Sequence, residues 1–149
     1  MKQKITRIFA VLCALLVISC SDTLDIQQAY NFSLSSWHLP AKIAVGEPVE
    51  IRLTLAREGD YTGAVYRIGH VQMAGNGVLA DQHGTPLTDR ESRPLADVPG
   101  LDTSDPCRQV FTLWYTATAG QKSEIELTAT DNFGQRSSLK ITFDVTPDS

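Results

Sequence analysis

The sequence predicts an all-β fold, a sandwich of antiparallel strands. After residue 20, apolar and polar residues alternate with a period of two in several short segments, as in strands that bury one face. Turn signals recur at about ten-residue spacing, and no segment there keeps a helical period of 3.6 residues. The length of 149 residues is that of one small globular domain. We therefore expect seven to eight short strands around a single core.

The first half of the predicted sandwich contains the clearest strand. Residues 49–56 alternate strictly between apolar and polar side chains, after Pro48. A turn at Glu58-Gly59-Asp60 predicts residues 61–73 as its hairpin partner. Asn76-Gly77, a strong turn signal, is then expected to join that strand to a short one at residues 78–81. Two further strands are expected at residues 32–36 and 42–45.

The second half contains three more expected strands. Residues 107–118 are apolar at both odd and even positions, which predicts a central strand covered on both faces, with Cys107 as a small buried thiol. Residues 125–129 and 139–145 alternate and are joined by the turn Asp131-Asn132-Phe133-Gly134. Because only one core cysteine remains, the expected sandwich is immunoglobulin-like but lacks the intersheet disulfide.

The N-terminal segment has the pattern of a signal peptide. Basic residues Lys2, Lys4 and Arg7 precede eleven uninterrupted apolar residues, 8–18. Eleven helical residues span about 16 Å, roughly half the hydrocarbon core of a bilayer. The run ends in Val17-Ile18-Ser19-Cys20, which resembles the lipobox of bacterial lipoproteins and implies cleavage before Cys20 and lipidation of that cysteine. An ordinary secretory signal with a chance cysteine is the alternative.

These features predict three parts: a lipoprotein signal peptide at residues 1–19, a lipidated tether at 20–30 and the sandwich domain at 31–147. Serine directly after the lipid cysteine resembles the signal for transport to the outer membrane, so we expect an outer-membrane anchor in the cell envelope. Both the periplasmic and the surface face remain open. Removing residues 1–19 leaves 10 basic and 17 acidic residues, a charge of −7, which disfavours direct nucleic-acid binding.

A long polar loop is predicted from Thr88 to Asp105, and loops of this length are often functional or disordered. Its acids Asp97, Asp102 and Asp105, together with Trp37, are the candidate interaction residues. No metal site and no cofactor is predicted, because the histidines lie in different elements without ligand spacing and the acidic stretch lacks a calcium-loop pattern.

The sequence predicts that the protein is not an enzyme. It contains no Gly-x-Ser-x-Gly, P-loop or His-Glu-x-x-His pattern. A thiol enzyme at Cys107 would need a nearby histidine and an electropositive setting, whereas Asp102 and Asp105 lie close in sequence.

Several motifs resemble the TraQ family of conjugative-transposon proteins. They are Asp25-Ile26-Gln27-Gln28 followed by Tyr30 and Phe32, Gly46-Glu47, Arg57-Glu58-Gly59-x-Tyr61-x-Gly63, Phe111-x-Leu113-x-Tyr115-Thr116 and Asp131-Asn132-Phe133-Gly134-Gln135. The resemblance implies an immunoglobulin-like or transthyretin-like sandwich and an envelope lipoprotein of a transfer operon. It implies no catalytic residue.

Two functions are therefore carried forward. The first is a lipid-anchored cell-envelope accessory of a conjugative transposon transfer system, which acts as a structural or protein-interaction module and contacts other envelope proteins of the apparatus. The alternative is a surface glycan-binding or adhesion lipoprotein that uses Trp37 and the acidic loop.

Overall fold

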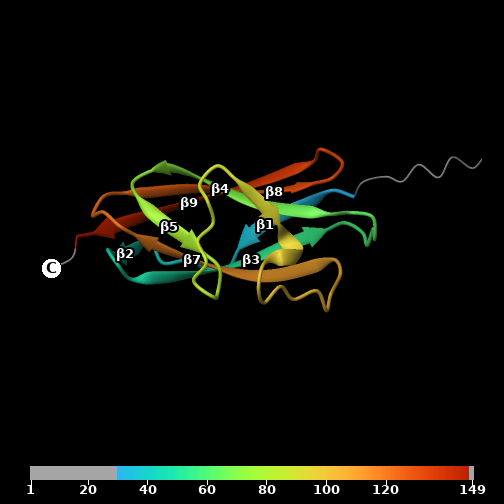
Figure 1. Ribbon diagram of the computed structural model, residues 1–149, viewed down its shortest axis with the longest axis horizontal. Helices are drawn as coiled ribbons and strands as arrows, with labels where there is room; N and C mark the ends of the chain where they lie inside the picture. The colour runs from blue at the N-terminus through green and yellow to red at the C-terminus, as the bar shows by residue number, and fades with distance from the viewer. Residues whose placement is uncertain (1–29, 148–149) are drawn as a thin grey trace, which may run out of the picture.

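The computed structural model describes residues 30–147, which form a β-sandwich of nine strands (Figure 1). The predicted signal peptide, Cys20 and nearly all of the predicted tether lie outside the described residues. One sheet has the order β1-β3-β7-β5, and the other has the order β2-β9-β8-β4-β6. The four-stranded sheet comprises β1 (Phe32–Ser36), β3 (Pro48–Arg57), β7 (Arg108–Ala117) and β5 (Gly77–Ala80). The five-stranded sheet comprises β2 (Lys42–Ala44), β9 (Arg136–Thr146), β8 (Ser123–Asp131), β4 (Tyr66–Ala74) and β6 (Ser92–Pro94).

The alternating residues form the core between the two sheets, and the predicted all-β sandwich is confirmed. Ile51, Leu53 and Leu55 of β3 are fully buried and face the apolar side of the other sheet. Tyr115 of β7 stacks on Phe143 of β9 with ring centroids 5.6 Å apart, so these two rings join the layers. Burial of apolar surface, at about 25 cal/mol per Å², is the main force that holds such layers together.

The predicted turn at residues 131–134 is confirmed as the β8–β9 hairpin. The Asp131 carboxylate accepts hydrogen bonds from the backbone N–H groups of Phe133 and Gln135, at 3.0 and 2.8 Å. Gly134 has a φ of +82°, a conformation that suits glycine. A local side-chain cap and one glycine therefore explain why this hairpin could be predicted.

The hairpin predicted at Glu58-Gly59-Asp60 is wrong, whereas the turn at Asn76-Gly77 joins two strands as predicted. β3 pairs with β1 and β7, whereas β4 pairs with β6 and β8, so the β3–β4 connection crosses from one sheet to the other. The Asn76-Gly77 turn likewise passes from β4 to β5, which pairs with β7 in the opposite sheet. Strand β4 also begins at Tyr66 rather than at residue 61. A turn signal shows where a chain reverses but not which sheet receives the next strand.

Strand β7 is central, between β3 and β5, but only one of its faces is deeply buried. Phe111, Leu113 and Tyr115 point into the core, whereas Val110 and Trp114 are only half-buried on the outer face. The expectation of a strand covered on both faces is therefore wrong. The sandwich also contains one parallel pair, because β2 runs parallel to β9.

The predicted polar loop from Thr88 to Asp105 is instead a structured segment. It contains β6 and a short 3-10 helix, η2 (Leu95–Asp97), and it buries Leu95 and Val98. We call residues 81–102 the strap: it leaves β5, joins β4 through β6 and returns to pair Asp102 with Val110 of β7. In Figure 1 the strap crosses the front of the sandwich. Its few apolar side chains cover the core on the open edge of the sandwich, the side where the edge strands β5 and β6 lie.

Cys107 is not the buried core thiol that was expected. It is half-buried and lies just before β7, and it is absent from the core cluster of the described residues. The strand begins one residue later because a turn precedes it: Asp105 Oδ1 accepts the N–H of Cys107 at 2.9 Å, and the Asp105 carbonyl accepts the N–H of Arg108 at 3.0 Å. No helix within residues 30–147 is long and apolar enough to span a bilayer.

Candidate functional site: the outer face of the four-stranded sheet

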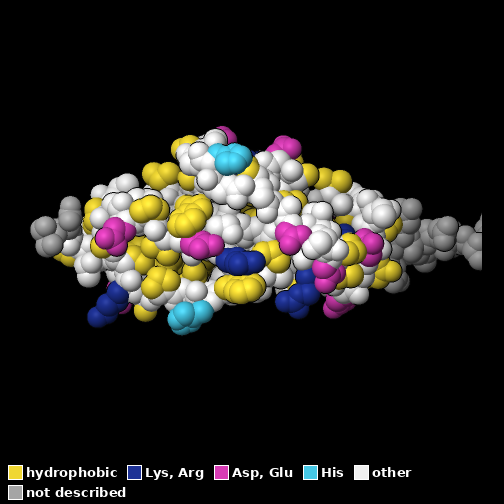
Figure 2. Space-filling view, turned by 90° about the horizontal axis from the view of Figure 1, so that it is seen from below, with side chains coloured by type: hydrophobic (Ala, Val, Ile, Leu, Met, Phe, Trp, Pro, Cys, Tyr) yellow, Lys and Arg dark blue, Asp and Glu magenta, His cyan; other side chains and the backbone are white. Residues whose placement is uncertain are grey.

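The outer face of the four-stranded sheet carries aromatic and charged side chains in adjacent positions. Glu50 of β3 lies opposite Trp114 of β7, and Arg52 lies opposite Thr112 in the same register. All four are on the face turned away from the core, because their neighbours Ile51 and Leu113 point inward. Figure 2 looks onto this face. Hydrophobic side chains gather over its centre and left half, and a basic and an acidic side chain lie next to each other among them.

Trp37, which follows β1, is held firmly on this face. Its backbone N–H donates to the Arg52 carbonyl at 2.9 Å, and its indole Nε1 donates to Thr54 Oγ1 at 3.3 Å. The Arg52 guanidinium carbon lies 4.4 Å from the centre of the Trp37 ring, a cation–π contact. The side chain is nevertheless 54% exposed. The tryptophan is thus a rigid aromatic surface with one face already occupied by a cation.

Asp102 lies next to this pair through backbone pairing with β7. Its N–H donates to the Val110 carbonyl at 2.8 Å, and its carbonyl accepts the Val110 N–H at 3.1 Å. Hydrogen bonds from Ser104, and to a smaller extent the positive charge of Arg52, hold the pKa of the Asp102 carboxyl below its usual value. The structure therefore brings two predicted interaction residues, Trp37 and Asp102, to opposite sides of Arg52.

The other two predicted residues have local structural contacts. The Asp97 carbonyl, in η2, accepts a hydrogen bond from Arg93 Nη2 at 2.9 Å. Asp105 caps the turn before Cys107. Neither residue makes a hydrogen bond or an ion pair with Trp37 or Arg52 among the contacts of the described chain, so the site includes only half of the predicted set.

A shallow groove of about 460 Å³ continues the same face towards β5. Val78, Ala80, Trp114, Pro48 and Thr116 line it, and the turn at the start of the strap forms its rim. Trp114 and Arg52 were not predicted as site residues; Trp114 lies within residues 107–118, the strand that was expected to be covered on both faces. The signal that could have found Trp114 is its even position in β7, where the odd positions Phe111, Leu113 and Tyr115 already fill the core.

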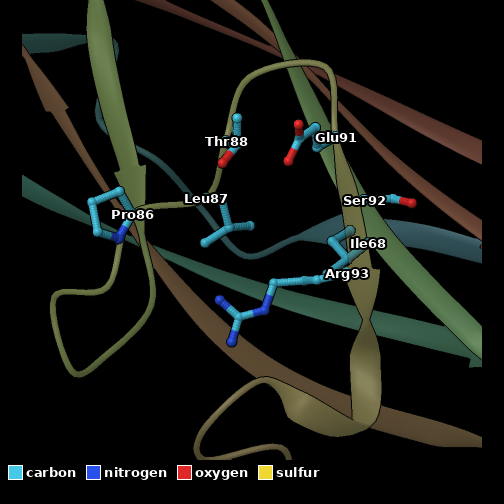
Figure 3. Close-up of a pocket in the computed structure, with 7 residues that line it drawn as sticks. All are labelled: Ile68, Pro86, Leu87, Thr88, Glu91, Ser92 and Arg93. Carbon is cyan, nitrogen blue, oxygen red and sulfur yellow. The ribbon is translucent and has the colours of Figure 1, made fainter.

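A second hollow, of about 250 Å³, lies beneath the strap between residues 86–88 and 91–93 (Figure 3). Ile68 and Leu87 form its apolar part. Arg93 extends away from Glu91 in this view, and its guanidinium pairs with the buried carboxylate of Asp81 at 3.4 Å. The basic group that lines this hollow is thus engaged in holding the strap.

The histidines and acidic side chains of the described residues do not come together as a metal site. No cluster of three or more His, Cys, Asp or Glu side chains able to hold a metal ion occurs within residues 30–147. His38 and His83 are exposed, and His70 is buried with no hydrogen-bond partner at Nδ1. Burial lowers the pKa of His70, and the nearby charge of Asp89 offsets part of this effect.

Three solved structures share this fold over most of their length. A conjugative transposon lipoprotein from Bacteroides eggerthii is 28% identical, with a TM-score of 0.65, and the match covers 78% of this chain and 99% of that one. A lipoprotein from Bacteroides thetaiotaomicron is 34% identical, with a TM-score of 0.63 and coverage of 83% and 86%. A conjugate transposon protein from Bacteroides vulgatus is 31% identical, with a TM-score of 0.62 and coverage of 83% and 91%.

A comparison with curated proteins found no match. The profile of the TraQ conjugal transfer protein family matches residues 4–146, which is nearly the whole sequence. This match agrees with the motifs from which the resemblance was inferred and with the two-sheet architecture. The chain belongs to the TraQ conjugal transfer protein family.

Proposed function

We propose that this protein is a lipid-anchored, non-enzymatic accessory of a conjugative transposon transfer apparatus, and that it binds another envelope protein through the outer face of its four-stranded sheet. The observation that carries the binding proposal is the fixed Trp37–Arg52 pair beside an apolar groove. Aromatic residues and arginine are enriched where protein interfaces gain most of their binding energy.

The geometry of this face supports a protein partner. The Trp37 indole donates to Thr54 and packs against the Arg52 guanidinium, so little side-chain freedom remains to be lost when a partner binds. The groove beside Trp114 offers an apolar centre, and Glu50, Arg52 and Asp102 provide a charged border. An apolar centre with a polar rim is the usual arrangement of a protein interface.

The experiment is affinity purification of the full-length protein from cells that express the whole transfer operon, with transfer frequency measured in parallel. Trp37→Ala combined with Arg52→Glu should remove the co-purified envelope protein and lower transfer while the domain stays folded. Met73→Ala is the matched control, because Met73 is 55% exposed, close to the 54% of Trp37, but lies on the other sheet. Unchanged co-purification in the double variant would contradict the assignment of this face.

The anchor is part of the same proposal. We propose lipidation at Cys20 and an outer-membrane location, on the strength of the lipobox and of the family in which the chain lies. Metabolic labelling with a palmitate analogue should mark the wild type and not Cys20→Ser. Fractionation of the two membranes then locates the labelled protein, and protease treatment of intact cells distinguishes the periplasmic from the surface face.

Glycan binding remains the second candidate because the Trp37 ring is exposed. A sugar could stack only on the ring face that Arg52 does not cover. Binding on a glycan array that is lost in Trp37→Ala would favour this function. A co-purified protein that is lost in the same variant would favour the transfer accessory.

A further inference from the structure

The end of the sandwich from which the N-terminal segment leaves presents a group of apolar side chains. We call this group, Tyr30, Tyr61, Val65 and Phe133, the apolar tip. Tyr30, Val65 and Phe133 are 43%, 58% and 41% exposed, and they are three of the six exposed large hydrophobic residues in the described chain. In Figure 1 the β3–β4 and β8–β9 connections and the start of β1 all lie at this same end.

Contacts among these three segments show that the apolar tip is built as a unit. The Tyr61 and Phe133 rings pack with centroids 5.5 Å apart. The Val65 N–H donates to Asn132 Oδ1 at 2.9 Å, and Asn132 Nδ2 donates to the Gly63 carbonyl at 3.0 Å. These bonds fix the two loops to each other and hold the apolar side chains in place.

Tyr30 is attached to the same unit. Gln135 Nε2 donates to the Tyr30 carbonyl at 3.3 Å. A Cβ atom at Gly59 would lie 2.8 Å from the Tyr30 ring, so a side chain at that position would displace the ring. Two of the motifs noted in the sequence, at residues 57–63 and 131–135, therefore meet at the first described residues of the chain.

Charged groups at this end are engaged internally. Arg57 pairs with Asp60 at 2.9 Å and donates to the Tyr61 carbonyl at 3.4 Å. Asp131 accepts the hydrogen bonds of its own turn, and Glu58 accepts one from Asn31 at 3.3 Å. Asp60 thus has a cation, whereas Asp131 and Glu58 keep their negative charge and have hydrogen-bond donors only. The apolar tip can therefore enter the hydrated headgroup level but not the hydrocarbon core, where an unpaired charge is costly.

Given the proposed lipid anchor at Cys20, on which this inference rests, we infer that the apolar tip rests on the lipid bilayer and inserts its aromatic rings at the headgroup level. Ten residue steps from Cys20 to Tyr30 span at most about 35 Å, so this end of the domain is held within that distance of the lipid anchor. Aromatic side chains are favoured at membrane–water interfaces. The lipid supplies attachment, and the apolar tip supplies a fixed orientation.

The test uses the full-length lipidated protein on phosphatidylcholine vesicles whose acyl chains carry bromine, a contact quencher of tryptophan fluorescence. Phe133→Trp places a probe in the apolar tip, and Val78→Trp is the matched control, because Val78 is 44% exposed on the four-stranded sheet. Relative to the wild type, the added emission of Phe133→Trp should be blue-shifted and quenched by the brominated lipid, and that of Val78→Trp should not. Adding Val65→Asp to Phe133→Trp should abolish most of that quenching.

The outcomes separate this inference from the anchor on which it rests. Co-flotation with vesicles together with quenching of Phe133→Trp supports both. Co-flotation without quenching leaves the anchor in place and overturns the apolar tip as a membrane contact. Absence of co-flotation overturns the anchor and this inference together. Quenching that disappears at high salt would also contradict an apolar contact, since only charge attraction is screened.

Discussion

The carboxylate of Asp81 lies 3.4 Å from the guanidinium of Arg93, and this ion pair joins the end of β5 to β6 across the open edge of the sandwich. Asp81 is only 2% exposed. It also accepts the backbone N–H groups of His83 and Thr85, at 2.9 and 3.1 Å. Burial raises the pKa of Asp81, but these hydrogen bonds and Arg93 outweigh that effect, so the pKa lies below its ordinary value.

Removing the Arg93 charge should therefore destabilise the fold. We expect Arg93→Met to lower the free energy of unfolding by about 1–3 kcal/mol, because a buried carboxylate loses its cation. Urea unfolding measures the change. Arg90→Met is the control, since the Arg90–Asp89 pair is exposed and exposed pairs contribute about 0–1 kcal/mol. Equal effects of the two substitutions would contradict a structural role for the Asp81–Arg93 pair.

Gly69 allows the strap to lie close against β4. A Cβ atom at this position would be 2.7 Å from the Glu91 carbonyl oxygen. Gly69→Ala should therefore push residues 91–92 away from the strand and expose the strap to proteases. Limited proteolysis with mass spectrometry should find new cleavage within residues 86–93. Gly63→Ala is the control, because its nearest contact is the far end of the Tyr61 side chain. If Gly69→Ala resists proteolysis as well as the wild type does, the strap accommodates the added methyl group without opening, and the prediction is wrong.

The Tyr115 hydroxyl connects polar groups inside the core. It donates to Ser123 Oγ at 2.9 Å, and Gln72 Nε2 donates to it at 3.0 Å. Because Ser123 is completely buried, we expect Tyr115→Phe to lower stability by about 1–2 kcal/mol. Tyr66→Phe should lower the free energy of unfolding by less, since the Tyr66 hydroxyl makes no hydrogen bond within the described chain. Thermal unfolding of the two variants compares them directly, and the reverse order would contradict the role of this network.

His70 should make stability depend on pH. Its pKa in the folded protein is below the ordinary histidine value of 6.5, chiefly because burial disfavours the charged form. Below pH 6.5 the unfolded chain therefore binds a proton that the folded chain does not, and stability falls as the pH decreases from about 6.5 towards the folded pKa. Urea midpoints from pH 7.5 to 5 should decline less in His70→Asn than in the wild type. The urea midpoint of His83→Asn, a substitution at an exposed site, should decline over this pH range as that of the wild type does.

The thiol-enzyme alternative can be tested at Cys107. This side chain is half-buried, and no histidine donates to or accepts from it within residues 30–147. We expect Cys107→Ser to leave transfer frequency unchanged and to alter stability by less than about 1 kcal/mol. Conjugation assays with the substituted gene provide the measurement. A large loss of transfer with normal protein levels would reopen a chemical role for this thiol.

Strand positions could be predicted for strands that bury one face and expose the other to solvent. Ile125, Leu127 and Ala129 alternate with polar residues because β8 packs on the core with one face only. For the β3–β4 and β4–β5 connections the sheet of the next strand could not be predicted, since a turn such as Gly75-Asn76 reverses the chain in the same way whether that strand joins the same sheet or the opposite one. The sequence did not indicate that the strap is structured, because only Leu87, Leu95 and Val98, at irregular spacing, anchor it in the core.

The candidate site was predictable only in part. Trp37 and Asp102 were expected to take part in binding, but Arg52, which connects them, occupied an unremarkable polar position in a strand. Its role depends on three segments that meet in space: the residues after β1, β3 itself and the end of the strap. Local sequence patterns do not show which segments lie side by side in the folded protein.

Strand β9 begins at the β8–β9 hairpin and ends where it pairs in parallel with β2, so its two ends can serve to measure the orientation of the domain on a membrane. Gln135 holds Tyr30 at the beginning of β9, and the eleven residues of that strand then run about 36 Å to its far end. Fluorophores at residue 147 and at Tyr30 would therefore mark the two ends of one rigid strand. Energy transfer from each to a labelled membrane would report whether the domain stands upright, tilts or lies flat.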